Sequence, residues 1–300
     1  MGAPAVQTFL PARDYDLDAT LSSGQAFRWR EREGGWEGVI SGRWVRLRGC
    51  KDGIAAETAL PQEDWTWLRD YLQSDLDLKS MLQTFPDDGP MRASVSACRG
   101  LRLLRQEPWE CLASFILSST KQIVQIQQIV ALLCERFGTP VVAPPDRPPV
   151  HAFPAAARIA AANEAELRAC KMGFRAPNLL ATARTVAEGT IDLRSLHLHD
   201  VDQAREKLIT LPGVGPKIAN CVLLFAYGFQ QAFPVDVWVM KALRHLYFPR
   251  RQPGPQRLHR FVSTYFGPNA GYAQQYLFHY MRLHNPIRPD QSSTIPPHSK

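Results

Sequence analysis

The chain has 300 residues, of which 45% are hydrophobic, so it is long enough to bury the core of one large or two to three small domains. Its formal net charge is +7, which favours polyanionic partners, and no apolar run approaches the roughly 20 residues of a membrane span. None of its 6 cysteines forms a CxxC pair and none follows Cys221, which argues against a zinc site and excludes a C-terminal four-cysteine iron–sulfur cluster.

The first 60 residues have the pattern of strands and turns. Phe27 and Trp29 alternate with polar or small neighbours, a period of two. Glycine-containing turns at 33–35 and 41–43 separate three predicted strands, at 27–30, 36–40 and 44–48. We therefore expect an N-terminal domain, residues 1–100, with a small antiparallel sheet.

From Pro61 onward the apolar residues recur at helical spacing. Helices are predicted at 61–72, from 108, and at 121–137, 155–162, 164–170, 176–188, 201–209 and 237–247, with a proline-rich loop at 139–154. The fold class is therefore α+β, with a helical domain at 101–284. The polar stretch 285–300 is predicted to be a disordered tail.

The most informative segment is the sequence LPGVGPK at 211–217. Gly213 and Gly215 permit a positive φ and let a phosphate approach backbone amides at the start of the next helix, so 201–228 reads as a helix–hairpin–helix that binds DNA. Lys217 lies in the first turn of that helix, where its amine can act as a nucleophile. The plainer alternatives are a tight turn that binds nothing and a surface lysine.

Asp236 follows nineteen residues after Lys217, at the predicted start of the next helix. Its common role is that of a helix N-cap. A carboxylate near the lysine can also stabilise a cationic sugar and transfer protons, and the two roles are compatible.

These motifs resemble the helix–hairpin–helix, glycine/proline-rich, aspartate superfamily of DNA glycosylases and, within it, the 8-oxoguanine DNA glycosylase/lyase family. The resemblance covers about residues 10–284. It also rests on SGQAFRW at 23–29, LRLLRQEPWECLASFILSST at 101–120 and GPNAGYAQQYLF at 267–278. The first of these blocks points to the 8-oxoguanine branch.

The resemblance implies a DNA-repair enzyme whose partner is double-stranded DNA with an oxidised purine. The damaged base is flipped out, Lys217 attacks C1′ of its sugar, and the resulting Schiff base permits β-elimination, with Asp236 as the catalytic aspartate. Neither a cofactor nor a metal is expected, because the lysine supplies the nucleophile. A monomer suffices, and the lack of a signal peptide indicates an intracellular, DNA-associated protein.

The resemblance also assigns the lesion pocket. Gly24 would offer its carbonyl to the N7 proton of 8-oxoguanine, and Gln274 would read the Watson–Crick edge of the base. Phe278 and Cys221 would pack on the two faces of the base. The plainer alternatives are a turn glycine and ordinary core packing.

Several positions depart from the family pattern around the opposite base. Thr120 stands where an asparagine usually fills the gap, and Gln125 replaces one of two arginines that bond the orphaned cytosine. Arg175 retains the other, after Phe174 in place of a tyrosine wedge. We therefore expect a relaxed preference for cytosine. Trp238 replaces a histidine that contacts phosphate.

Three other hypotheses compete with the interpretation as an 8-oxoguanine glycosylase/lyase. A monofunctional alkylpurine glycosylase shares the fold and the aspartate but normally lacks the lysine. An endonuclease III-like enzyme usually has the missing iron–sulfur cluster and no N-terminal sheet. A non-catalytic DNA-binding protein needs neither Lys217 nor Asp236.

Overall fold

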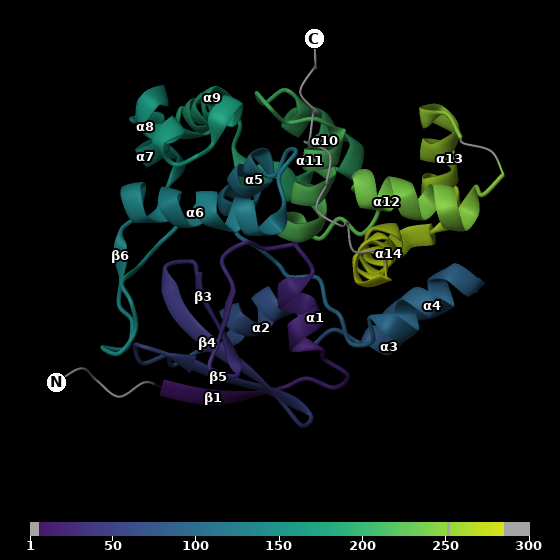
Figure 1. Ribbon diagram of the computed structural model, residues 1–300, viewed down its shortest axis with the longest axis horizontal. Coiled ribbons are helices and arrows are strands. Elements are labelled where there is room, and N and C mark those ends of the chain that lie inside the picture. Colours follow the sequence, from purple (N-terminus) through teal and green to yellow (C-terminus); the bar gives the residue numbers. More distant parts are fainter. Residues whose placement is uncertain (1–5, 251–252, 285–300) are drawn as a thin grey trace, which may run out of the picture.

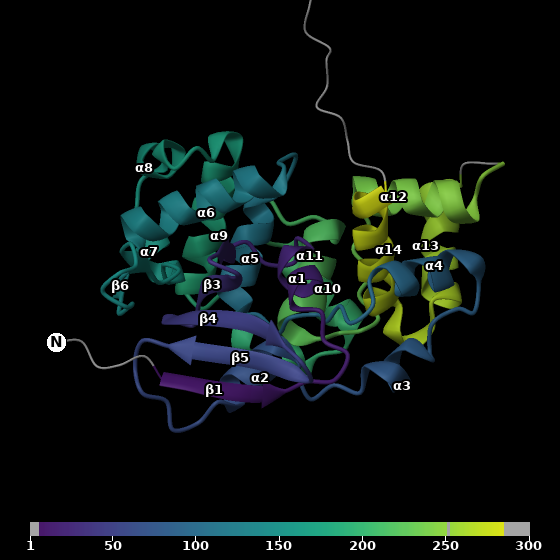
Figure 2. The same cartoon turned by 60° about the horizontal axis from the view of Figure 1, so that its bottom comes forward.

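The computed structural model describes residues 6–250 and 253–284, and its N-terminal part is a five-stranded antiparallel sheet. The strands are β1 (Val6–Pro11), β2 (Arg30–Arg32), β3 (Gly35–Ile40), β4 (Arg43–Cys50) and β5 (Gly53–Thr58), in the order β1-β5-β4-β3-β2. The predicted sheet is confirmed. Helix α2 (Thr66–Leu72) packs against it (Figure 2). Leu68 and Leu72 share a buried core with Leu47 and Ile54.

The strand predicted at 27–30 is wrong, because only Arg30 belongs to a strand. Both rings of the alternating pair are buried, but they enter different cores: Phe27 joins the helical core and Trp29 joins the core of the sheet. The period of two therefore reports a segment that bridges two cores. The edge strand β1 and its neighbour β5 were not predicted individually.

The rest of the chain is mostly helical. Its helices are α1 (Leu17–Ser22), α3 (Leu78–Leu82), α4 (Gly89–Ala97), α5 (Pro108–Leu117), α6 (Ile123–Phe137), α7 (Ala156–Ala160), α8 (Glu164–Ala169), α9 (Ala176–Ala187), α10 (Val201–Ile209), α11 (Pro216–Val222), α12 (Val237–Ala242), α13 (Pro255–Tyr265) and α14 (Ala270–His284). Short 3-10 helices are η1 (Gly173–Arg175), η2 (Leu193–Leu198) and η5 (Gly267–Asn269), and π-helices η3 (Leu223–Tyr227) and η4 (Leu243–Tyr247) extend α11 and α12.

Two predicted boundaries change. The helix expected from Pro61 begins at Thr66, with Trp65 as its N-cap. Just before it, the Asp64 carboxylate accepts a hydrogen bond from the Thr66 amide at 2.9 Å, which holds the preceding segment in a turn. The predicted loop 139–154 contains a short strand pair, β6 (Pro140–Val141) and β7 (Val150–His151). The predicted tail 285–300 lies outside the described residues.

The helical core begins before the predicted domain boundary at residue 100. Leu78, Phe85 and Met91 belong to this core, and α4 packs on α14 (Figure 1). The boundary itself stays a prediction. Within the described ranges, no helix combines the length and apolar character that crossing a membrane requires.

Candidate active site

The glycine hairpin joins α10 to α11, and Asp200 caps α10 as its sequence predicts. Gly213 has a φ of +77°, and a Cβ atom there would lie 2.8 Å from Asn178, so both conformation and space require glycine. Gly215 is extended, with a φ of −98°, so the positive φ that we allowed for both glycines occurs only at Gly213. Apart from its two chain neighbours, no described residue comes within 4 Å of a Cβ built on Gly215, which leaves the hairpin open on that side.

Lys217 is the second residue of α11, after Pro216. Its side chain is partly buried, and its Nζ atom donates to the Oγ atom of Ser118 at 3.2 Å. The same Nζ atom lies 5.3 Å from the centroid of the Phe115 ring. The amine is therefore held between α11 and the end of α5.

Asp236 is the N-cap of α12, and its carboxylate accepts from the Val239 amide at 2.8 Å. Burial raises the pKa of Asp236, although the positive charge of Lys217 opposes that rise. Burial also raises the pKa of the Cys221 thiol to about 11, and the charges of Lys217 and Asp236 act on it in opposite directions. The three side chains therefore occupy one electrostatic neighbourhood.

Three of the four residues predicted to hold the base lie on α14 and α11. Gln274 is 3% exposed, and its Oε1 atom has no hydrogen-bond partner among the described residues. Leaving a buried amide oxygen unpaired is costly, so this atom is suited to accept from a ligand. Phe278, one turn later, is partly exposed, and Cys221 is buried.

Gly24 lies on a tightly fixed loop. Its φ is +78°, and a Cβ atom there would lie 2.6 Å from Ile123 Cδ1, so a side chain cannot be added without displacement. The next residue, Gln25, is fully buried, and its Nε2 and Oε1 atoms bond the Arg102 carbonyl and the Leu104 amide, each at 2.8 Å. These bonds fix where the Gly24 carbonyl points.

A second anchor comes from α14, where Gln275 Nε2 donates to the Ser23 carbonyl at 3.1 Å. Sequence reasoning missed both Gln25 and Gln275. For Gln275 a signal was available, since it lies in the otherwise largely apolar stretch AGYAQQYLF at 270–278.

The residues predicted to face the opposite base surround the turn between α5 and α6. Thr120 is exposed and has a left-handed φ of 56°. Arg175 is only 3% exposed, and its guanidinium donates to the Ser119 carbonyl and to Thr120 Oγ1. Arg175 and Thr120 thus come together, but in this state the arginine is bonded to its own chain.

The other residues predicted to contact DNA form no hydrogen bond with Arg175 or Thr120 among the described residues. Gln125 accepts from the Gln122 amide at 3.1 Å and so caps α6. Phe174 is 61% exposed, with the Arg175 guanidinium 4.2 Å from its ring centroid. Trp238 is partly buried, with Lys241 Nζ 5.3 Å from its ring.

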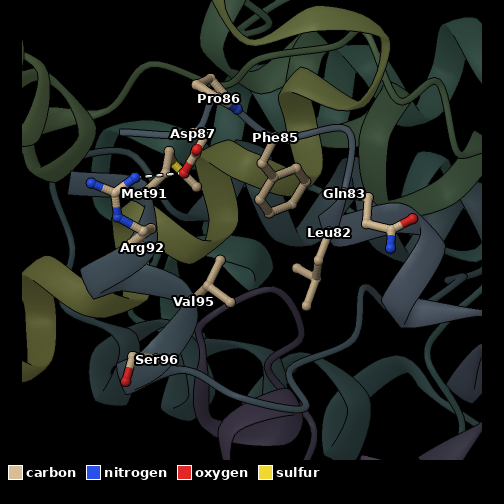
Figure 3. A pocket seen from close by; sticks show the side chains of 9 residues that line it. All are labelled: Leu82, Gln83, Phe85, Pro86, Asp87, Met91, Arg92, Val95 and Ser96. Carbon is tan, nitrogen blue, oxygen red and sulfur yellow. Dashed lines mark hydrogen bonds and ion pairs between the residues drawn. The ribbon is translucent and has the colours of Figure 1, made fainter. Parts of the chain in front are cut away.

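A cavity of about 400 Å³ lies elsewhere, beside α3 and α4 (Figure 3). Leu82, Phe85 and Val95 line its apolar side, and the ion pair of Arg92 with Asp87 borders it. No predicted site residue lines it. In the described part of the chain, no three His, Cys, Asp or Glu side chains cluster closely enough to hold a metal ion.

Two family models match consecutive parts of the chain. Residues 8–112 match the N-terminal domain of 8-oxoguanine DNA glycosylase, and residues 113–268 match the helix–hairpin–helix-GPD superfamily of base excision DNA repair proteins. Together they cover the sheet, the hairpin and Asp236.

Individual relatives agree with these models. A probable N-glycosylase/DNA lyase of Methanothermobacter thermautotrophicus is 31% identical over 91% of this chain and 95% of its own length. N-glycosylase/DNA lyase OGG1 of Arabidopsis thaliana is 31% identical over 87% of this chain and 76% of its own.

Solved structures show the same architecture. MBOgg1 in complex with a low-affinity DNA ligand superposes with a TM-score of 0.87 and 32% identity, covering 94% of this chain and 96% of that one. The 8-oxoguanine glycosylase/lyase of Clostridium acetobutylicum, bound to double-stranded DNA with cytosine opposite 8-oxoguanine, gives a TM-score of 0.86 at 28% identity, covering 93% and 98%.

Proposed function

Because this chain belongs to the 8-oxoguanine DNA glycosylase family and is a DNA N-glycosylase/lyase, we propose that it excises 8-oxoguanine from duplex DNA and cleaves the strand at the vacated sugar. The observation that carries the proposal is the shared neighbourhood of Lys217 and Asp236 at the start of two helices, beside the hairpin. A DNA-binding protein without chemistry would need neither side chain there.

The reaction begins when the damaged nucleotide leaves the stack. The Lys217 amine attacks C1′, the bond from C1′ to the base breaks, and the base departs with the bonding electron pair and gains a proton. Asp236 as a carboxylate stabilises the positive charge that develops on the sugar. Ring opening gives a protonated imine, and loss of a C2′ proton then expels the 3′ phosphate by β-elimination.

Recognition of the base uses the four pocket residues. The Gly24 carbonyl accepts from the N7 proton, which 8-oxoguanine has and guanine lacks. Gln274, with its unpaired oxygen, bonds the Watson–Crick edge. Phe278 and Cys221 pack on opposite faces of the ring.

DNA binding uses the hairpin amides around Gly213 and Gly215, which face a backbone phosphate, with Trp238 close to the same strand. One chain supplies every proposed residue, so a monomer is sufficient.

Recognition of the opposite base uses a second group of residues. Thr120, Gln125 and the wedge Phe174 offer fewer fixed hydrogen-bond donors than asparagine and arginine would. Arg175 is then the single arginine for the orphaned base. We therefore propose comparable excision opposite all four bases.

The proposal is tested with two labelled duplexes that differ only in carrying 8-oxoguanine or guanine at one position. Free 8-oxoguanine and a strand cut 3′ to the lesion are the expected products, with guanine left in place. Base release without a cut would indicate a monofunctional glycosylase, and binding without either product would indicate a non-catalytic protein.

A further inference from the structure

Arg282 lies on the helix that carries two of the proposed pocket residues. It follows Phe278 by four residues and Gln274 by eight, so the three share one face of α14. Its side chain is partly buried. Its place makes it a neighbour of the base site rather than of the solvent face.

The Arg282 guanidinium touches two walls of that site. Its Nη1 atom donates to the Ser22 carbonyl at 3.3 Å, and a Cβ atom built on Gly24 would lie 3.5 Å from the same nitrogen. The guanidinium carbon lies 5.5 Å from the Phe278 ring centroid. The cation therefore connects the lesion-reading loop with the stacking ring.

This cation has little to neutralise it. Among residues 6–250 and 253–284 it forms no ion pair, and Asp236 is the carboxylate whose charge acts on it. A guanidinium has five N–H donors, of which the Ser22 contact uses one. A partly buried cation with spare donors next to a ligand site is suited to bind an acceptor on that ligand.

We propose that Arg282 is a base-binding residue that donates to a carbonyl oxygen on the N7 edge of the flipped purine. This inference rests on the proposed function. In the pose proposed above, the N7 proton faces the Gly24 carbonyl, and the two oxygens of 8-oxoguanine at C6 and C8 flank N7. A donor beside Gly24 therefore faces the edge that carries them, and it complements the acceptor that Gly24 supplies.

The test separates contact with the base from effects on the sugar, the phosphates or the fold. Native protein, Arg282→Ala and Arg282→Lys are each given, under single-turnover conditions, a duplex with 8-oxoguanine and a matched duplex with an abasic site, which lacks the base. Arg99→Ala removes a cation from an exposed ion pair and is the control for lost charge. Thermal unfolding midpoints check that each variant is folded.

Arg282→Ala should slow excision of 8-oxoguanine by about 10- to 100-fold, as expected for a lost charged hydrogen bond, with abasic-site cleavage within about threefold of native. Arg282→Lys should recover part of the excision rate because it keeps a cationic donor. An equal fall on both substrates, or unchanged excision in both folded variants, would overturn the inference while excision by the native protein still supports the proposed function. If the native protein released no 8-oxoguanine, the proposed function and this inference would fall together.

Discussion

The Nζ atom of Lys217 donates to the Oγ atom of Ser118 at 3.2 Å, across a separation of 99 residues. The Ser118 hydroxyl in turn donates to the Phe115 carbonyl at 2.7 Å, so its oxygen is oriented to accept from the amine. This bond joins the helix after the hairpin to the end of α5. It holds the proposed nucleophile in one place before DNA arrives.

Ser118→Ala should therefore slow formation of the covalent imine by about tenfold, because a displaced nucleophile loses part of its alignment. Single-turnover borohydride trapping at saturating protein measures this step. Ser119→Ala, at the next position, is the matched control and should trap at the native rate. Equal rates in native protein and Ser118→Ala would show that the bond does not position the amine.

Two variants of Asp236 should separate its catalytic role from its role as a helix N-cap. Asp236→Asn keeps a good N-cap but loses the charge, so excision should fall by about 100-fold with little change in the unfolding midpoint. Asp236→Ala should lose excision and also about 1 kcal/mol of stability. Retained excision in Asp236→Asn would show that the carboxylate serves only as a cap.

The pH dependence of excision follows from the same carboxylate. Burial raises the pKa of Asp236 above its ordinary value of 3.8, and the active form is the deprotonated one. Single-turnover excision should therefore fall with acid at a pH above 3.8, and this limb should disappear in Asp236→Asn. An acid limb shared by both proteins would assign it to another group.

The opposite-base preference should respond to restored side chains. Thr120→Asn suits the left-handed φ of 56°, because asparagine tolerates that conformation. Gln125→Arg restores a second guanidinium that can bond the orphaned cytosine. The double variant should prefer cytosine over adenine by about tenfold or more in excision rate, against near-equal rates in the native protein. Gln128→Arg, exposed on the same helix, controls for the added charge. A strong preference for cytosine in the native protein would refute the relaxed reading.

The raised pKa of Glu110 should make the stability of the protein depend on pH. Burial raises its pKa to about 7 from an ordinary value of 4.5, although Arg28 lies 3.6 Å away. Between these two values the unfolded chain is ionised while the folded chain still holds the proton, so stability falls as pH rises through this window.

Compared with Glu110→Gln, the native protein should lose on the order of 1–3 kcal/mol of unfolding free energy between pH 4.5 and 7. Urea unfolding of both proteins across that range measures the difference. Parallel curves would show that Glu110 titrates at its ordinary pKa.

Features governed by short-range rules were predictable from the sequence. The hairpin glycines, the capping carboxylate of Asp236 and the 3.6-residue periodicity each depend on neighbours within about one or two turns. The predicted helices appear near their expected positions, whereas α1, α3, α4 and α13 were not predicted. The separation of Gln274 and Phe278 by one helical turn was equally predictable from the sequence.

Features that depend on distant pairing were not predictable. Val6 pairs with Thr58 in the sheet, and neither segment shows a distinctive alternation. The bond of Lys217 to Ser118 and the approach of Arg282 to Ser22 join residues that only the fold brings together. The hydrogen bond from Arg175 to Thr120 likewise depends on a turn 55 residues away in the sequence.

The proposed reaction depends above all on Lys217 as the nucleophile of a glycosylase/lyase. The most direct measurement is borohydride trapping on a labelled duplex with one 8-oxoguanine, using the native protein, Lys217→Gln and the exposed-lysine control Lys207→Gln. We expect a covalent adduct with the native protein and the control, and none with Lys217→Gln. An adduct of undiminished yield with folded Lys217→Gln, or free 8-oxoguanine without any native adduct, would contradict it.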